Sequence, residues 1–317
     1  MKIKLLGVRG SLPTPLGNDD YRKKIQKILQ RAIKSKLKDP KKINDFIDSL
    51  PDNLQYNFGG NTTCICVTSG SGKQYIIDCG SGLRPYGDEL MKSAFGRGEG
   101  YLPIFITHLH YDHIQGLPFF KPVYIPGNVL HFHSPYEKLH EHLKDQMKPP
   151  FFPATYEGTG STKKYTIIEP GKPLKFEDDF SVECFPLKHP NSSYAYKFTE
   201  KDKTFIFATD VEITGESFEN VNSDYNFFMN AGLLVIDSQY TLDESFKKFE
   251  WGHTSYTIAV NCGIRWKVGS LVLTHHEPAY SDDKLLSIYR DAVKHRNAMK
   301  MKIPAVFLAR EGMEFEL

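Results

Sequence analysis

Short runs of apolar residues recur along the chain and are separated by glycine, proline and polar residues. The runs are four to six residues long and rich in β-branched and aromatic side chains, a pattern that is typical of β-strands. The strands predicted in this way cover residues 65–68, 75–78, 104–107, 130–133, 204–209, 233–237, 271–274 and 305–309. We therefore expect a chain with several short strands along most of its length.

Segments with helical periodicity lie between several of these strands. In residues 136–147, 254–262 and 282–295, apolar side chains recur three and four positions apart, as on the buried face of a helix. The mixture of strands and helices indicates a layered α/β fold. One core can fill this length, so we expect residues 1–317 to form a single domain.

Residues 18–55 have a helical pattern of their own. Lysine and arginine occupy most positions of the first part, and one apolar stripe along it consists of Tyr21, Ile25, Ile28, Leu29, Ala32, Ile33 and Leu37. Asp39 and Pro40 suit the start of a second helix. The residues of that helix expected to face inward are Ile43, Phe46, Ile47 and Leu50. We predict a helical hairpin inserted between a strand and a glycine-rich loop.

Two uses of the inserted hairpin are open at this point. Its basic face could attract phosphate-bearing substrates, or it could simply keep a surface helix in solution, which is common for lysine-rich helices. Its apolar stripe could cover its own domain or a partner subunit, so a homo-oligomer is one alternative.

Composition adds few constraints. The formal net charge of +2 favours neither nucleic acid nor membrane as a partner. The five cysteines are odd in number and lie in or beside strand-like runs, without a C-x-x-C pattern, so we expect buried, reduced thiols. The first apolar stretch is too short for a signal peptide, and no later run approaches membrane-spanning length. These features predict a cytoplasmic protein without a membrane partner.

A cluster of metal-ligand residues follows the strand predicted at 104–107. His108, His110, Asp112 and His113 lie within six residues, on the turn that leaves the carboxyl end of that strand. Ligands of α/β sheets collect at such ends. His108 and His110 can converge on one ion while Asp112 and His113 reach a neighbouring position, and imidazole and carboxylate suit zinc, iron or manganese. Three histidines and an aspartate so close together are rarely structural.

Further ligands occur at the ends of later strand-like runs. His189 follows one such run, Asp210 ends another, and His275 ends a third. Each residue alone would be a weak signal, but all three have the residue type and the strand-end position that a shared metal centre requires. His276 is an alternative to His275, which its position at the strand end favours.

The order of these candidates along nearly the whole chain resembles the metallo-β-lactamase superfamily. The resemblance implies a four-layered αββα sandwich with a metal site along one edge. It also implies two divalent metal ions, zinc first, with manganese or iron as alternatives. One ion would be bound by His108, His110 and His189. The second would be bound by Asp112, His113 and His275, and Asp210 would bridge the two.

Smaller motifs resemble the branch of that superfamily that contains cyclic phosphodiesterases and tRNA 3′-processing endonucleases. They begin at Gly7, Gly59, Asp78, Ala208, Gly252 and Leu273. His253 matches the catalytic histidine of the branch and Asp237 the acidic partner that orients it, a pair suited to general acid catalysis. Together with the metal ligand Asp112 they form the expected catalytic set.

Other residues of these motifs are candidates for support and substrate binding. Asp78 resembles the aspartate that orients the metal-binding loop, although a turn aspartate bonded to local backbone is an alternative. Candidates for contact with the substrate, through charge or hydrogen bonds, are Arg9, Ser11, Asn61, Thr62, Asn191 and Ser192. Tight turns or loop packing would explain these six residues about as well.

The combined motifs fit hydrolysis of a small cyclic phosphodiester, such as a cyclic nucleotide or a cyclic sugar phosphate, by a hydroxide bound to two metal ions. An RNA-processing endonuclease of the tRNA 3′-end type is the first alternative, although the chain lacks a long, obvious flexible arm for gripping tRNA. Hydrolysis of a thioester or lactone on the same fold is another alternative, and a binding module that has lost catalysis is a fourth. His253 with Asp237 favours the phosphodiester.

Overall fold

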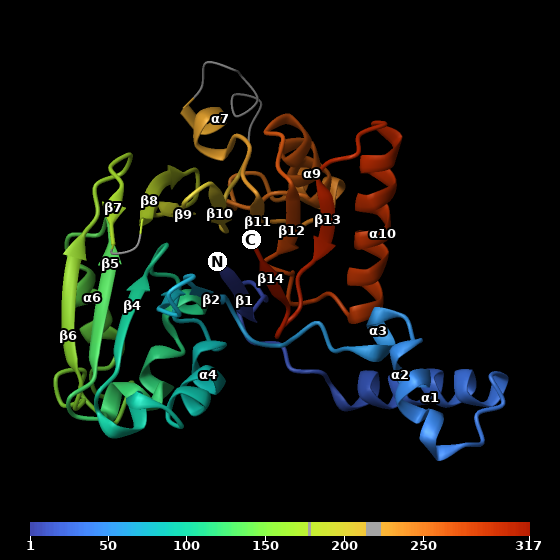
Figure 1. The fold of residues 1–317 in the computed structure, drawn as a ribbon, viewed down its shortest axis with the longest axis horizontal. Helices are drawn as coiled ribbons and strands as arrows, with labels where there is room; N and C mark the ends of the chain where they lie inside the picture. Colours follow the sequence, from blue (N-terminus) through green and yellow to red (C-terminus); the bar gives the residue numbers. More distant parts are fainter. Residues whose placement is uncertain (177–178, 214–222) are drawn as a thin grey trace.

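Two β-sheets form the centre of the computed structural model, which describes residues 1–176, 179–213 and 223–317 (Figure 1). The first sheet has the strand order β14-β1-β2-β3-β4-β5-β6. Its strands are β1 (Lys2–Gly7), β2 (Cys64–Thr68), β3 (Gln74–Ile77), β4 (Tyr101–Phe105), β5 (Val129–Ser134), β6 (Thr162–Ile167) and β14 (Glu314–Glu316). From β3 to β6 the strands are parallel, and the others are antiparallel.

The second sheet has the order β13-β12-β11-β10-β9-β8-β7. Its strands are β7 (Leu174–Lys175), β8 (Phe180–Leu187), β9 (Ser193–Glu200), β10 (Lys203–Ala208), β11 (Leu233–Asp237), β12 (Ser270–Thr274) and β13 (Ala305–Leu308). From β10 to β13 the strands are parallel. Parallel strands are covered on both faces and read as continuous apolar runs, and every residue of β11 is buried.

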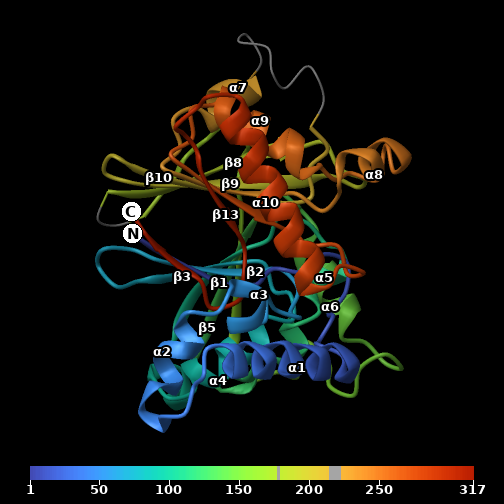
Figure 2. The same ribbon diagram turned by 90° about the vertical axis from the view of Figure 1, so that its right-hand side faces the viewer.

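Helices cover the outer face of each sheet, and the two inner faces meet in a shared core. The helices outside the insertion are α4 (Leu83–Leu90), α5 (Tyr111–Ile114), α6 (Leu139–Gln146), α7 (Ser223–Phe228), α8 (Leu242–Lys247), α9 (Tyr256–Arg265) and α10 (Asp282–Ala298). Apolar residues of α4 and α6 pack on the first sheet, and those of α9 and α10 pack on the second. Figure 2 shows the two sheets one above the other. The prediction of a four-layered αββα sandwich is confirmed.

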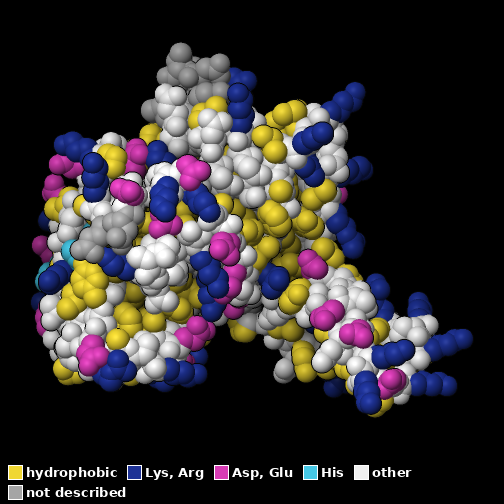
Figure 3. All heavy atoms as spheres, viewed as in Figure 1, with side chains coloured by type: hydrophobic (Ala, Val, Ile, Leu, Met, Phe, Trp, Pro, Cys, Tyr) yellow, Lys and Arg dark blue, Asp and Glu magenta, His cyan; other side chains and the backbone are white. Residues whose placement is uncertain are grey.

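The inserted segment contains α1 (Asn18–Lys34), α2 (Ile43–Asp48) and α3 (Asp52–Gln55). It projects from the two sheets as an arm (Figure 1), and lysine and arginine side chains stand out along it (Figure 3). No residue of α1 is buried. The prediction that Ile43 and Ile47 face inward is wrong, because their exposed fractions are 45% and 40%, whereas Leu50 is buried. A projecting helix pair has little protein beside it to cover its apolar side.

The apolar stripe of α1 is also largely uncovered. Tyr21, Leu29 and Ile33 have exposed fractions of 55%, 56% and 77%. Helical periodicity predicted the stripe correctly as a pattern, but within the described chain this part of it faces solvent.

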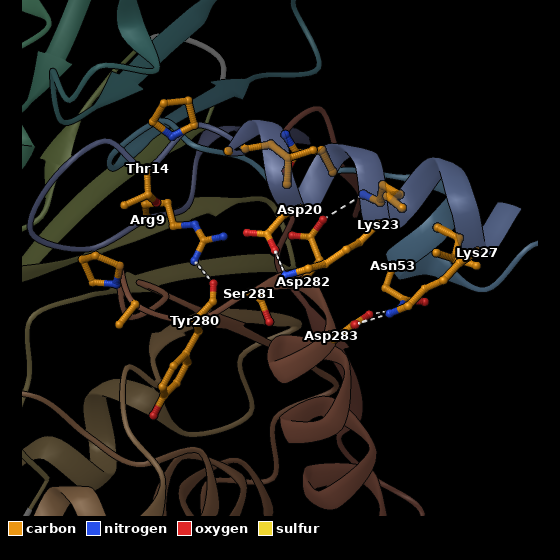
Figure 4. A pocket seen from close by; sticks show the side chains of 18 residues that line it. Arg9, Thr14, Asp20, Lys23, Lys27, Asn53, Tyr280, Ser281, Asp282 and Asp283 are labelled. Carbon is orange, nitrogen blue, oxygen red and sulfur yellow. Dashed lines mark hydrogen bonds and ion pairs between the residues drawn. The ribbon is translucent and has the colours of Figure 1, made fainter.

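Ion pairs connect the arm to the start of α10. Lys24 Nζ lies 2.8 Å from Asp282 Oδ2 and also donates to the carbonyl of Tyr56. Lys27 pairs with Asp283, which also accepts a hydrogen bond from Asn53 (Figure 4). These contacts border a pocket of about 320 Å³ between the arm and α10. The basic side of the arm is therefore partly used for docking within the chain.

Replacing Lys24 by alanine should loosen this docking. The Lys24 side chain is only 14% exposed, and its loss leaves the buried Asp282 carboxylate without this partner. We expect the free energy of unfolding to fall by about 1.5–3 kcal/mol, the range for hydrogen bonds to charged groups. Urea denaturation and limited proteolysis of the arm measure the change. Lys23→Ala is the matched control because Lys23 is 68% exposed, and an equal loss in both variants would contradict the docking role.

Two further observations bear on the sequence analysis. All five cysteines are buried and free, as predicted. Among the residues that the structure describes, no helix combines the length and the apolar character that crossing a membrane requires.

Candidate functional site

The candidate metal ligands gather where strands of both sheets end. His108 follows β4, Asp210 follows β10, and His275 follows β12 directly. Asp210 and His275 have positive φ angles of 57° and 61°, which are uncommon for residues other than glycine. Such conformations persist where the surrounding structure holds them, and they cluster at functional sites. The backbone therefore turns sharply where these side chains enter the site.

A first group consists of His108, His110, His189 and Asp210, whose ligand atoms all lie within 4.8 Å of one another. His189 Nε2 lies 3.2 Å from His110 Nδ1 and 3.7 Å from Asp210 Oδ1. His108 Nε2 lies 3.6 Å from the same Asp210 oxygen. Three imidazole nitrogens and one carboxylate oxygen thus surround one point.

A second group consists of Asp112, His113, Asp210 and His275, again within 4.8 Å. His113 Nε2 lies 3.2 Å from Asp112 Oδ2 and 3.1 Å from Asp210 Oδ2. His275 Nε2 lies 3.4 Å from Asp210 Oδ1. Asp210 belongs to both groups, so the structure brings together the two ligand sets that the resemblance implied.

The donor atoms of both groups fit divalent metal ions. The Nε2 atoms of His108, His113 and His275 are buried and have no hydrogen-bond partner among the described residues. Burial lowers the pKa values of His108, His110 and His189 and so favours neutral imidazoles. Neutral imidazole and carboxylate are the forms that bind metals such as zinc.

The aspartates are held in the ionised form. Burial alone would raise the pKa of Asp210, but the neighbouring histidines, His275 first, hold it well below its usual range. Burial likewise opposes ionisation of Asp112, and the proximity of His113 outweighs it and lowers its pKa. Two buried, ionised carboxylates at one site are stabilised by a cation.

Hydrogen bonds from the protein orient the ligands. Asp78 follows β3, accepts from the amide and hydroxyl of Thr107 at 2.8 Å each, and lies 2.7 Å from His113 Nδ1. His189 Nδ1 lies 2.8 Å from the carbonyl oxygen of Gly252. In each case the bond at Nδ1 leaves Nε2 free to face the site, which is how outer partners of metal ligands commonly act.

His253 and Asp237 form a separate pair beside the second group. His253 Nδ1 lies 2.7 Å from Asp237 Oδ2. Asp237 also accepts hydrogen bonds from the amides of Asp210, Gln239 and Thr254. His275 completes a third possible ligand group with this pair, but the oxygens of Asp237 are already engaged by these four donors. The pair is therefore better suited to proton transfer than to metal binding.

Asp237 favours the protonated form of the His253 imidazole. Burial alone would lower the pKa of His253, but the charge and hydrogen bond of Asp237 outweigh burial and raise that pKa to about 9. A protonated imidazole can donate its proton to a leaving group.

We expect Asp237→Asn to shift the alkaline limit of activity to lower pH. Asparagine removes the negative charge that favours the protonated imidazole, so the pKa of His253 falls. Because the proton donor is lost as pH rises through that pKa, turnover declines at lower pH than in the parent protein. Full pH profiles of kcat measure the shift, and Asp243→Asn, at an exposed position of α8, is the control. An unmoved alkaline limb would remove Asp237 from this role.

The structure divides the six expected substrate contacts into two sets. Ser11 lines the opening above the metal groups, and its amide donates to Asp112 Oδ2 at 2.8 Å. Asn191 and Ser192 are exposed beyond His189, and Asn191 lines a cleft that also contains His108 and His110. These three residues are in place to meet a substrate.

The other three make hydrogen bonds within the protein, and their contact with a substrate stays a prediction. Arg9 is 4% exposed, and its guanidinium donates to the carbonyl oxygens of residues 59, 277 and 280. Asn61 donates to both carboxylate oxygens of Glu311. Thr62 is fully buried, and its hydroxyl accepts from Ser81 and Gln115. These hydrogen bonds support the loops around the site.

Two residues near the site were not identified from the sequence. Glu212 accepts hydrogen bonds from Lys188 and from the amide of Gly252, and so connects the loop of His189 to the loop of His253. A side chain at Gly252 would meet His189, because a Cβ atom there would lie 2.2 Å from His189 Nδ1. Gly252 belongs to a recognised motif, which was an available signal, whereas nothing near Glu212 in the sequence indicates its role.

His276 has a structural position. Its Nε2 lies 2.9 Å from the carbonyl oxygen of Ala309. Burial lowers its pKa to about 3, so it is neutral. The structure thus places His275 with the other ligands and His276 outside the groups, as its strand-end position favoured.

Comparisons with known proteins agree with this geometry. Residues 74–276 match the family model described as "Beta-lactamase superfamily domain". A protein named ribonuclease Z from Picosynechococcus sp. is 34% identical over 290 positions, which cover 77% of this chain and 86% of the relative.

Two solved structures have a similar fold over the whole chain. The metallo-beta-lactamase fold protein YhfI from Bacillus subtilis has a TM-score of 0.62 at 18% identity, with coverage of 100% of this chain and 98% of the other. The short form of human tRNase Z has a TM-score of 0.59 at 17% identity, with coverage of 100% and 99%. At these identities the likeness concerns the fold.

Proposed function

The chain belongs to the β-lactamase superfamily and is a metal-dependent phosphodiester hydrolase, and from that premise we propose that it cleaves RNA at the 3′ end of a tRNA precursor. The observation that carries the proposal is the 34% identity to a ribonuclease Z over most of the length of both chains. The motifs had favoured a small cyclic phosphodiester, and the relatives support the RNA alternative better.

The shape of the site is compatible with a long substrate. The opening above the two metal groups has a volume of about 350 Å³ and contains His253 and Ser11. It shares Leu109, His110 and Tyr111 with a neighbouring cleft of about 820 Å³. A strand can therefore pass over the metal groups and continue beyond them.

Each group of residues has a role in the proposal. One divalent ion would be held by His108, His110, His189 and Asp210, and a second by Asp112, His113, Asp210 and His275, with zinc as the first candidate because the ligands are mainly imidazole. Such ions, when bound, lower the pKa of water and stabilise the charge on a phosphate.

Side chains and one backbone amide of the chain donate the proton and orient the metal-binding residues. His253 donates a proton to the departing ribose oxygen, and Asp237 keeps its imidazole oriented and protonated. The amide of Ser11 fixes the carboxylate of Asp112, and Asp78 fixes the ring of His113.

The test is a direct comparison of substrates. The metal-loaded protein is assayed with a tRNA precursor that carries a 3′ trailer and with 2′,3′- and 3′,5′-cyclic nucleotides, and the cleaved ends are mapped. The expected result is one cut at the junction of tRNA and trailer, with binding that weakens steeply as salt rises. Hydrolysis of cyclic nucleotides with an intact precursor would overturn the proposal and restore the small-substrate alternative.

A further inference from the structure

The cleft beside the metal groups has a wall that the proposed chemistry does not use. Its floor contains His108 and His110, and its sides come from α5, from α6 and the turn after it, and from the loop of Asn191. The volume of about 820 Å³ is that of a site for a sizeable ligand.

Aromatic side chains in this cleft are unusually exposed. Tyr111 and Phe151 have exposed fractions of 76% and 77%. Tyr111 lies between the ligands His110 and Asp112 and lines both the cleft and the opening above the metal groups. Both side chains line one cleft, and exposed apolar side chains that gather at one place, unlike singly scattered ones, mark a surface for a ligand or partner.

A third ring is fixed in position by the backbone. The hydroxyl of Tyr136 donates to the carbonyl oxygens of Asn191 and Ser192, at 3.2 and 2.8 Å. The hydroxyl proton therefore points at the protein backbone, and the part of Tyr136 that lines the cleft is mainly its ring. This bond also ties the loop beyond His189 to the wall of the cleft.

We propose that this cleft holds a nucleobase of the nucleotide next to the scissile phosphate, which stacks on Tyr111 and Phe151. The inference rests on the proposed function, because it assigns a subsite for the same RNA substrate. Base stacking on aromatic rings is the common way to hold single-stranded RNA, and it tolerates any base because every base has an aromatic face.

Continuity with the metal groups favours a nucleotide as the occupant. The cleft shares Leu109, His110 and Tyr111 with the opening above the metal groups, so the base next to a phosphate at the metal groups can reach the cleft. Lys148 lies at the border of the cleft with its side chain 53% exposed, and its Nζ lies 3.2 Å from Asp145 Oδ1. Asp145 lines the same cleft, so the two charges offset each other there and the inference is carried by the aromatic rings.

The experiment measures whether the binding contribution of a flanking base depends on the Phe151 ring. Binding is measured with the metal-loaded His253→Ala protein, which should hold RNA without cutting it, and with the same protein carrying Phe151→Ala. The RNA is a tRNA precursor, compared with versions in which single nucleotides flanking the cleavage site lack their base. Tyr101→Ala is the control, because Tyr101 is 53% exposed at the start of β4, away from the cleft.

We expect Phe151→Ala to weaken binding of the complete RNA by roughly 5- to 100-fold. At one flanking position, removal of the base should weaken the binding of RNA to the His253→Ala protein by a similar factor. With that base-free RNA, the further change Phe151→Ala should weaken binding little more. Tyr101→Ala should leave both affinities unchanged. Two results would overturn the inference while leaving RNA cleavage intact. One is that Phe151→Ala weakens binding of complete and base-free RNA equally; the other is that base-free RNA binds as tightly as complete RNA at every flanking position.

Failure of the proposed function has a different signature. If no RNA is bound or cut, the contribution of the base is measured with small substrates. The KM for nucleoside 2′,3′-cyclic phosphates is compared with the KM for ribose 2′,3′-cyclic phosphate, in the wild-type and the Phe151→Ala proteins. A KM preference for the base that disappears in Phe151→Ala keeps the subsite and rejects RNA. Equal KM values for both compounds, or no hydrolysis of either, overturn the subsite too.

Discussion

Asp210→Asn is expected to abolish hydrolysis and to lower the metal content of the protein. Asp210 is the one residue common to both ligand groups: its Oδ1 lies near His108 and His189 of the first, and its Oδ2 near His113 of the second. Asparagine keeps the shape but removes the charge that pairs with two cations. Metal affinity should fall by more than the roughly 10- to 100-fold that loss of an outer partner costs. Turnover should fall about 1,000-fold or more, which is about 4 kcal/mol.

Asparagine is the better replacement because of the backbone. Asp210 has a φ of 57°, in the left-handed region that asparagine tolerates better than alanine. Thermal unfolding in a chelator should therefore show little change in the fold. Elemental analysis and turnover are measured beside Asp202→Asn, an exposed residue at the opposite end of β10. If Asp210→Asn retains two ions per chain and full turnover, the bridging position is contradicted.

The residues of the two candidate metal groups could be predicted from the sequence because two local signals coincide. His108, Asp210 and His275 have the residue type of a ligand, and each follows an apolar run that predicts a strand. The carboxyl ends of parallel strands in one sheet share an edge, which brings Asp210 and His275 of the second sheet together; that His108 of the first sheet lies beside them follows from the packing of the two sheets. The same argument gave no distances, so the assignment of each residue to one of the two groups by proximity required the structure.

Arg9 shows why substrate contacts were harder to predict. Its sequence neighbours form a glycine-rich motif that suits a phosphate, but its guanidinium meets carbonyl oxygens of residues 59, 277 and 280. Those partners lie up to 271 positions away. No local pattern indicates that such distant backbone will occupy the donors. Asn61 meets Glu311 across a similar distance in sequence.

The arm illustrates a second limit. Periodicity shows that a helix has an apolar side, and it predicted α1 well. It does not show whether anything covers that side, because the covering surface belongs to other parts of the fold or to another molecule. Ile33 is 77% exposed for this reason, although its position in the stripe resembles that of a core residue.

His253→Ala is expected to reduce turnover by about 100- to 10,000-fold while both metal ions remain bound. His253 belongs to neither of the two groups that share Asp210. Its Nδ1 is bonded to Asp237, so its remaining nitrogen is the one that can reach a leaving oxygen. Elemental analysis should give the same metal content as the parent protein. Loss of metal together with activity would instead identify His253 as a ligand.

The leaving group separates proton donation from a merely structural role. A ribose oxygen needs a proton as it departs, whereas p-nitrophenolate is stable without one, so bis(p-nitrophenyl) phosphate should be hydrolysed nearly as fast by His253→Ala as by the parent. Asp237→Asn should show the same selectivity to a smaller degree. Because the two residues act as one unit, the double variant should be little worse than His253→Ala alone. An equal loss on both substrates would mean that His253 shapes the site and donates no proton.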